Sequence, residues 1–146
     1  MAEIYNQGIE DRVATFLTEP RRAAHIQEWL DDGRPFIVAG QDGRVMAFAV
    51  ASPYRGSAHY EGVREFSIYV ARDGRGQGFG RMALLLLFEE VRARGWWKLV
   101  SRVFPENRAS RKLLASLGFR EVGIYEKHAR LDGRWRDVVI VEKLLI

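Results

Sequence analysis

The spacing of hydrophobic residues changes several times along the chain, and each change marks a predicted secondary-structure element. Apolar residues three and four apart predict helices, whereas short alternating or continuous apolar runs between turn residues predict strands. The predicted helices are residues 4–11, 22–31, 80–94 and 107–117. The predicted strands are residues 36–39, 44–51, 63–70, 98–104, 119–131 and 135–145. This order predicts an α/β fold in which helices flank a mixed sheet.

Two short polar segments predict tight hairpins between neighbouring strands. One is Gln41 with the Asp-Gly pair that follows it, and the other is Asp132-Gly133. Aspartate followed by glycine favours the two-residue turns that match the twist of paired strands. The helix at 80–94 differs from the others because residues 82–88 are apolar on nearly every side, which predicts that it is buried all round.

Length and composition limit the class of protein. The 146 residues, 47% hydrophobic and 29% charged, predict one globular domain that spans 1–146. Cysteine is absent, which excludes disulfides and thiolate metal sites. His25, His59 and His128 have no partners at metal-ligand spacing, so no metal site is expected. A net charge of +4 is compatible with an anionic partner, but it does not distinguish a phosphorylated cofactor from nucleic acid.

The chain contains no sequence typical of a targeting or membrane segment. Its start lacks a basic stretch followed by an apolar one, and the apolar run at 82–88 is too short to span a bilayer. We therefore expect a cytoplasmic protein with no membrane partner. Net positive charge is the only feature that favours nucleic-acid binding, and charge alone is not sufficient evidence. No nucleic-acid partner is therefore expected.

A glycine-rich segment, GRGQGFG at Gly74 to Gly80, lies between the strand at 63–70 and the long helix. Glycine accepts positive φ, so such a loop can turn successive backbone N–H groups towards one ligand. The positive end of the following helix favours the same kind of ligand. The segment therefore predicts an anion site suited to a phosphate or pyrophosphate group.

Several glycine motifs were compared with this loop. A phosphate-binding P-loop is excluded because neither the loop nor the following helix contains lysine. The dinucleotide pattern G-x-G-x-x-A matches Gly78, Gly80 and Ala83, but these glycines do not directly follow the strand, as that fold requires. The pattern R-x-x-G-x-G matches Arg75, Gly78 and Gly80. A loop that only caps a core helix remains the structural alternative.

The R-x-x-G-x-G pattern resembles motif A of the GNAT acyltransferases, which move an acetyl group from acetyl-CoA to an amine. Other segments are similar to the phosphinothricin acetyltransferase branch of that superfamily, in the order IYNQGIEDRVATF, TEPR, VREFSIYV, PENRASRKLLASLGF and YEKHARLDGRWRDVVIVEKLL. Within that branch the chain most resembles the enzymes that acetylate arsinothricin, phosphinothricin or methionine sulfoximine. The resemblance covers nearly the whole chain.

This resemblance implies the GNAT acyl-CoA acyltransferase fold, acetyl-CoA as co-substrate and a homodimer. The implied reaction is direct acetylation of the α-amine of a small amino acid or toxic amino-acid analogue. The chain departs from the family in two ways. Members usually open with a strand before the first helix, whereas this chain begins within that helix, so the first strand is expected to be missing. Leu114 stands where many members carry a tyrosine that protonates the leaving thiolate, so the expected acid is another tyrosine or water, unless the thiolate leaves unassisted.

Glu65 is the candidate general base. A protonated amine must lose a proton before it can attack, and Glu65 is the only carboxylate in VREFSIYV. The structural alternative is a strand glutamate paired with Arg64 or another arginine, and the resemblance favours the catalytic role. By the same resemblance, the end of this strand contacts the pantetheine arm and gives an N–H to the thioester oxygen. The residues concerned are Ile68, Tyr69 and Val70.

The resemblance also assigns further cofactor and substrate residues. Asn107 is a predicted helix N-cap that would additionally bind the cofactor arm. The residues assigned to the cofactor's phosphates are Arg75, Gly76, Gln77, Gly78, Phe79, Gly80 and Arg81. Those assigned to the substrate pocket are Phe16, Arg55, Gly56, Ser57, Tyr60, Glu65, Phe66 and Ser67.

Arg55 is the most informative substrate residue, because its planar guanidinium can donate two parallel bonds to a carboxylate or phosphinate. Ser57 stands where related enzymes often carry a second arginine. Two alternatives stay open at this point. One is a GNAT enzyme that acetylates a peptide, a protein or another small amine, although Arg55 disfavours a cationic polyamine. The other is a non-catalytic acyl-CoA-binding module, which Leu114 permits and Glu65 disfavours.

Overall fold

The computed structural model describes residues 1–12, 15 and 17–146. The described helices are α1 (Ala2–Asp11), α2 (Ala23–Asp31), α3 (Phe79–Ala93) and α4 (Arg108–Ser116). The described strands are β1 (Phe36–Gln41), β2 (Arg44–Pro53), β3 (Val63–Val70), β4 (Lys98–Val103), β5 (Arg120–Leu131) and β6 (Arg134–Leu144). Two short 3-10 helices, η1 (Ala58–Tyr60) and η2 (Arg72–Gly74), precede and follow β3. These elements confirm the helices and strands predicted from the hydrophobic pattern.

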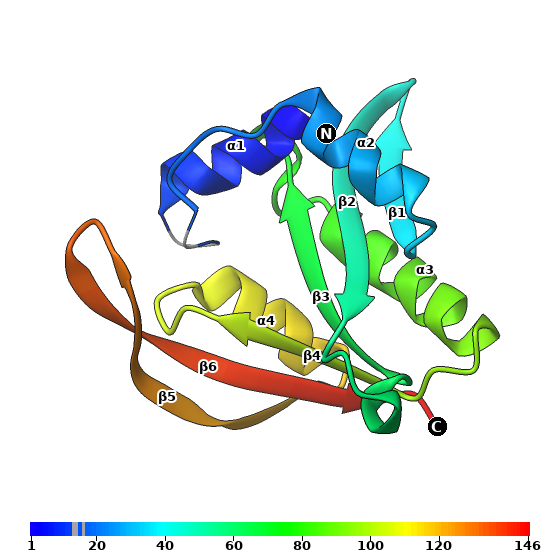
Figure 1. Ribbon diagram of the computed structural model, residues 1–146. Coiled ribbons are helices and arrows are strands. Elements are labelled where there is room, and N and C mark those ends of the chain that lie inside the picture. The colour runs from blue at the N-terminus through cyan, green and yellow to red at the C-terminus, as the bar shows by residue number, and fades with distance from the viewer. Residues whose placement is uncertain (13–14, 16) are drawn as a thin grey trace.

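The strands of the described chain form one mixed sheet in the order β1-β2-β3-β4-β6-β5. All neighbouring strands are antiparallel except β3 and β4, which are parallel. The register between β3 and β4 runs only from Val63 opposite Lys98 to Glu65 opposite Val100. Beyond Glu65 the two strands separate, as Figure 1 shows. The sheet therefore consists of two antiparallel halves that are joined at one end.

Aromatic packing on both faces holds β3 in place. Tyr5 of α1 packs on Phe48 and Tyr69, with ring centroids 6.4 and 4.5 Å away, so α1 covers one face of β2 and β3. On the opposite face, Phe66 of β3 packs against Phe119, with ring centroids 5.1 Å apart. Helix α3 covers that opposite face along β1 and β2. Because β3 is packed from both sides, its path away from β4 is fixed by the core.

The prediction that α3 is buried all round was wrong. One face of the helix is fully buried, with Leu84 and Leu87 each at 0% exposure. On the other face, Met82, Leu85 and Leu86 keep between 44% and 48% of their side-chain surface exposed. Only one face of α3 has the sheet as a partner, and periodicity does not reveal how many faces of an apolar helix are covered. No helix among the described residues is both long and apolar enough to cross a membrane.

The two hairpin turns agree with the sequence-based expectations. Asp42 and Gly43 have φ values of 53° and 76°, and Asp132 and Gly133 have 51° and 75°. Positive φ at both central residues defines the predicted type of hairpin turn. In the described residues no strand precedes α1, and β1 is an edge strand of the sheet.

A cluster of ion pairs ties the end of α1 to the segment after β3. Oxygens of Asp11 accept from Arg72 Nη2 at 2.8 Å and from Arg75 Nη2 at 2.7 Å. Burial of Asp11 opposes its ionisation, but hydrogen bonds from Arg72 and Arg75 outweigh burial and hold its pKa below the ordinary value. A pKa depressed in the folded state stabilises the fold above the unfolded-state pKa. This contribution is lost as the pH falls through the folded-state pKa.

We therefore expect Asp11→Asn to lower the melting temperature at pH 7 by about 2–4 °C, which corresponds to roughly 0.5–1 kcal/mol of stability. The difference from the wild type should shrink at acid pH, as the pH falls through the lowered folded-state pKa of Asp11, because protonated Asp11 no longer pairs with the arginines. Thermal unfolding followed by circular dichroism across this pH range measures the effect. Glu28→Gln, at an exposed position of α2, is the control and should change little at either pH. An Asp11→Asn defect of equal size at both pH values would mean that the ion pairs do not stabilise the fold.

Candidate functional site

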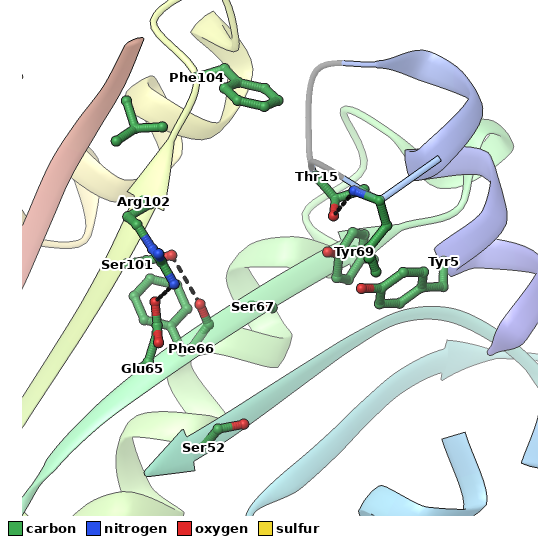
Figure 2. Close-up of a pocket in the computed structure, with 12 residues that line it drawn as sticks. Tyr5, Thr15, Ser52, Glu65, Phe66, Ser67, Tyr69, Ser101, Arg102 and Phe104 are labelled. Carbon is green, nitrogen blue, oxygen red and sulfur yellow. Dashed lines mark hydrogen bonds and ion pairs between the residues drawn. The ribbon is translucent and has the colours of Figure 1, made fainter. Parts of the chain in front are cut away.

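A cavity of about 320 Å³ opens where β3 and β4 separate. Figure 2 shows β3 crossing its floor, with Glu65 and Arg102 at one end and Tyr69 and Tyr5 at the other. Its size is typical of pockets that hold small ligands. The described residues that line it are Tyr5, Thr15, Leu17, Ser52, Glu65, Phe66, Ser67, Tyr69, Ser101, Arg102, Phe104 and Val138.

The separation of the strands leaves backbone donors of β3 without a strand partner. Ala71 donates its N–H to Met46 of β2 at 2.8 Å, and every second residue of an antiparallel strand faces the same neighbour. The N–H groups of Ile68 and Val70 must therefore face the other way, towards the gap beside β4. Ser101 Oγ donates to the Phe66 carbonyl at 2.9 Å, where the gap begins. Ile68 and Val70 can thus donate to a ligand that enters the gap.

Glu65 lies at the point of separation, and its side chain is 31% exposed. Its carboxylate forms an ion pair with Arg102 of β4. The sequence predicted pairing with Arg64 or another arginine as the structural alternative. Arg64 instead lies against Trp96, with its Cζ atom 3.5 Å from the ring centroid. The partner of Glu65 is therefore a second cavity residue, so the ion pair is part of the site.

Sequence analysis did not identify Arg102. Alternation along β4 places Arg102 on the same face of the sheet as Val100, and the register places Val100 beside Glu65. The only signal in the sequence was therefore an arginine within a predicted strand. Its relation to Glu65 depends on the pairing of β3 with β4, which sequence patterns do not give.

Tyr69 contributes a neutral hydroxyl group to the cavity. Burial raises the pKa of its phenol well above the ordinary value, and a hydrogen bond with Tyr5 adds to this effect. Tyr69 therefore stays protonated at physiological pH and can act as a hydrogen-bond donor. It cannot serve as a general base there.

A second, smaller cavity of about 60 Å³ continues from the gap towards α4. Leu114 is 2% exposed and lines this cavity, so it offers no proton to a ligand there. Asn107 caps α4 as predicted, because its Oδ1 accepts from the Ser110 N–H at 3.2 Å. The same cavity brings Asn107 together with Ile68 and Tyr69, as the cofactor assignment requires. Val70 lines neither cavity and is the last residue of β3, four positions before the first glycine of the loop.

The glycine loop contains two residues in the left-handed backbone conformation. Gly76 and Gly78 have φ values of 76° and 87°, which side-chain-bearing residues rarely adopt. Gln77 donates its side-chain amide to the Asp73 carbonyl at 2.8 Å and so fixes the loop from within. The first intrahelical bond of α3 runs from Met82 to Gly78, so the preceding N–H groups of the helix, including that of Phe79, remain available to a ligand.

The remaining residues assigned to the cofactor have structural contacts of their own. Arg75 is held by Asp11 and by the Val70 carbonyl, whose oxygen lies 3.4 Å from its Nε. A Cβ on Gly80 would lie 3.2 Å from both Val70 and Leu113, so glycine permits close packing between α3, β3 and α4. Arg81 reaches Ser116 of α4 at 3.4 Å. Gly80 and Arg81 therefore lie at the start of α3, whereas Arg75 lies between the end of α1 and the end of β3.

The structure brings only part of the expected substrate set to the cavity. Glu65, Phe66 and Ser67 line it. Four residues of the β2–β3 loop do not line the cavity in the described structure, namely Arg55, Gly56, Ser57 and Tyr60. The Arg55 guanidinium lies over the rings of Tyr54 and Tyr60, with Cζ 5.1 and 5.8 Å from their centroids. This loop follows Ser52, which pairs with Glu65, so it leaves the sheet at the Glu65 end of the cavity.

Two further expectations concern the substrate pocket and a metal site. Phe16, which was expected in the substrate pocket, lies outside the described residues. Among the residues that the structure describes, no group of three or more histidine or acidic side chains is arranged to hold a metal ion.

Comparison with known proteins gives consistent matches. Residues 1–119 match the model of the acetyltransferase (GNAT) family. The chain is 33% identical to the phosphinothricin N-acetyltransferase of Alcaligenes faecalis, with 97% of this chain and 75% of that protein covered. It is 32% identical to the L-methionine sulfoximine/L-methionine sulfone acetyltransferase of Pseudomonas aeruginosa, with 95% and 84% covered.

The fold also matches solved structures of the same kind. One is the acetyltransferase yncA from Salmonella typhimurium, solved with its cofactor acetyl-CoA. The TM-score is 0.94 at 27% sequence identity, and the match covers 99% of this chain and 86% of that one. The two strand halves, the gap and the glycine loop described above thus belong to a fold that holds acetyl-CoA in a relative.

We expect Gly78→Ala to reduce the thermal stabilisation that acetyl-CoA gives the protein. A Cβ at this position would occupy the open space beside the start of α3, where the phosphates of the cofactor are expected to bind. Gly95→Ala is the matched control. Gly95 follows the other end of α3, has a φ of 76° and also has nothing within 4 Å of an added Cβ. Both variants should lose similar intrinsic stability, because both strain a positive φ. Differential scanning fluorimetry with saturating acetyl-CoA separates the two. Equal acetyl-CoA shifts in both variants would mean that Gly78 only shapes the loop.

Proposed function

Because the chain belongs to the acetyltransferase (GNAT) family, we propose that it transfers the acetyl group of acetyl-CoA to the α-amine of a small amino acid or toxic amino-acid analogue. The observation that carries this proposal is the cavity at the strand separation, where one carboxylate lies beside unpaired backbone donors. The named activities of the relatives from Alcaligenes faecalis and Pseudomonas aeruginosa support the choice of substrate class. Acetyl-CoA is the co-substrate, as in the Salmonella typhimurium relative.

In the proposed reaction Glu65 accepts a proton from the substrate ammonium, directly or through one water molecule. The free amine then attacks the thioester carbonyl, so that an N–C bond forms, the C–S bond breaks, and the nitrogen gives its second proton to the departing thiolate or to water. Negative charge builds on the carbonyl oxygen as the amine attacks, and the N–H groups of Ile68 or Val70 are oriented to stabilise it. Because they are fixed in β3 beforehand, they need no rearrangement during the reaction.

The leaving thiolate must gain a proton or depart as the anion. Leu114 cannot provide one, so the donor is another group in the smaller cavity or water. The described residues with a hydroxyl group that line this cavity are Ser67, Tyr69, Ser101 and Ser110. Tyr69 stays protonated because burial raises its pKa, which suits it to hydrogen bonding more than to complete proton transfer.

The glycine loop is proposed to bind the phosphates of acetyl-CoA. Backbone N–H groups of Gly76, Gly78 and the first turn of α3 form the proposed cradle. Arg75 and Arg81 add positive charge beside it, and Asn107 is proposed to bind the cofactor arm through the smaller cavity. Binding of phosphates would require Arg75 to share or exchange its contact with Asp11.

Arg55, Gly56, Ser57 and Tyr60 are proposed to form the rim of the substrate site at the Glu65 end. Their loop follows Ser52, which lines the cavity, and the aromatic rings of Tyr54 and Tyr60 hold Arg55 in place. We also propose that the protein acts in the cytoplasm, where acetyl-CoA is available, and as a homodimer. The exposed apolar face of α3 supports a partner surface, and light scattering should give a mass of twice 16.8 kDa.

The decisive variant for the reaction is Glu65→Gln, which keeps the shape of the side chain and removes the base. General-base catalysis typically accelerates a reaction by about a hundredfold to ten-thousandfold, so kcat at pH 7 should fall by on the order of that factor. The deficit should shrink as pH rises, because the substrate amine then loses its proton without help. Steady-state kinetics with acetyl-CoA and L-methionine sulfone between pH 6 and 10 measure both effects.

Glu61→Gln, outside the cavity on the β2–β3 loop, is the control and should keep wild-type kinetics. Acetyl-CoA should stabilise both variants as much as the wild type, because neither change touches the glycine loop. A Glu65→Gln enzyme with near-normal kcat at pH 7 would remove Glu65 as the base.

A further inference from the structure

Glu65 and Arg102 are the only charged side chains among the described residues that line the larger cavity, and they are paired with each other. We propose that this pair recognises the zwitterionic head of an α-amino acid, with Arg102 binding the carboxylate and Glu65 the ammonium group. The inference rests on the proposed function and narrows it. It makes a free α-carboxylate a requirement of the substrate, which excludes peptides' N-termini and simple amines as good substrates.

The position of the two side chains suits this task. Glu65 and Arg102 project from the same face of the sheet at the end of the cavity, as Figure 2 shows. The ammonium and carboxylate groups of an α-amino acid are attached to one carbon atom. Only an acidic and a basic side chain that lie side by side can therefore bind both groups at once. Arginine presents a planar fork that fits a carboxylate through two parallel bonds.

The ion pair is also easy to open. The side chains of Arg102 and Glu65 are 50% and 31% exposed, and ion pairs with this much solvent contact contribute little stability. When an amino acid enters, each partner exchanges one charged contact for another, so no charge is left unpaired. An amine without a carboxylate would pair with Glu65 and leave Arg102 without its anion.

The exchange also links recognition to the reaction. In the free protein Arg102 occupies an oxygen of Glu65. When the substrate carboxylate draws Arg102 away, the Glu65 carboxylate becomes available to accept a proton from the amine. This end of the cavity adjoins the gap that the Ile68 N–H group faces, so the amine is held beside the proposed site of the thioester. Arg102 is thus a specificity-determining residue that acts on the substrate carboxylate.

The test compares L-methionine sulfone with its carboxamide, which keeps the amine and lacks the anionic carboxylate. The wild type should prefer the acid in kcat/KM. Arg102→Gln should raise KM for the acid by about tenfold to a hundredfold, the range expected for loss of a charged bidentate contact. The same variant should acetylate the carboxamide as well as or better than the wild type, because Glu65 is then free of its internal partner. Arg102→Lys should recover part of the preference for the acid.

Opposite effects on the acid and the carboxamide separate this role from a structural one, since misfolding would lower both rates. Arg134→Gln, which changes an exposed arginine on β6 that lines neither cavity, is the matched control and should leave the preference unchanged.

Equal losses for both substrates in Arg102→Gln would overturn the proposal. So would a preference for the acid that is lost only in Arg55→Gln, because the rim loop would then bind the carboxylate. If the wild type acetylates the carboxamide as well as the acid, the reaction stands and the zwitterion proposal is wrong. If it acetylates neither of them, nor phosphinothricin nor L-methionine sulfoximine, the proposed function itself is wrong.

Discussion

The site depends on one constraint, the loss of pairing between β3 and β4 after Glu65 and Val100. A parallel pair that continued would bury the N–H groups of Ile68 and Val70 in ladder hydrogen bonds and close both cavities. Their separation instead creates the larger cavity, the smaller cavity and two oriented donors at one place. The candidate site is therefore formed mainly by the path of the backbone, and its side chains add to it.

Packing on both faces keeps this arrangement open. Tyr5, Phe48 and Tyr69 stack on one side of β3, and Phe66 with Phe119 packs on the other. The unpaired edge of β3 would otherwise move towards β4, since unpaired backbone groups favour partners. The gap is thus maintained by the hydrophobic core, while the polar groups inside it remain free for a ligand. Placing the site on strands rather than loops also gives Glu65 and the backbone donors fixed relative positions.

Sequence patterns predicted the elements well and the contacts between them only in part. The strand at 63–70 was placed correctly because its apolar and aromatic residues end at a glycine-rich segment, and the Asn107 cap followed from its position before a helix. The pairing of Glu65 with Arg102 depends on the register of two strands far apart in the sequence, and no local pattern encodes it. The exposed side of α3 was missed for a similar reason, because the apolar residues Met82, Leu85 and Leu86 alone do not show how many faces of the helix have partners. The residues themselves predicted the glycine loop as an anion site, and the resemblance favoured a catalytic role for Glu65, but the position of Arg55 outside the cavity lining required the structure.

Hydrogen exchange at the gap tests the central claim most directly. The Ile68 and Val70 amides face a gap with no strand partner, so they should exchange quickly in the free protein compared with the alternate amides of β3 that bond to β2. Saturating acetyl-CoA should slow exchange at these two amides and at Gly76 to Arg81, because the ligand would accept their hydrogen bonds. Hydrogen exchange resolved by nuclear magnetic resonance measures each amide with and without acetyl-CoA. Protection confined to other parts of the protein, with Ile68 and Val70 unchanged, would contradict the account that acetyl-CoA binds where β3 and β4 separate.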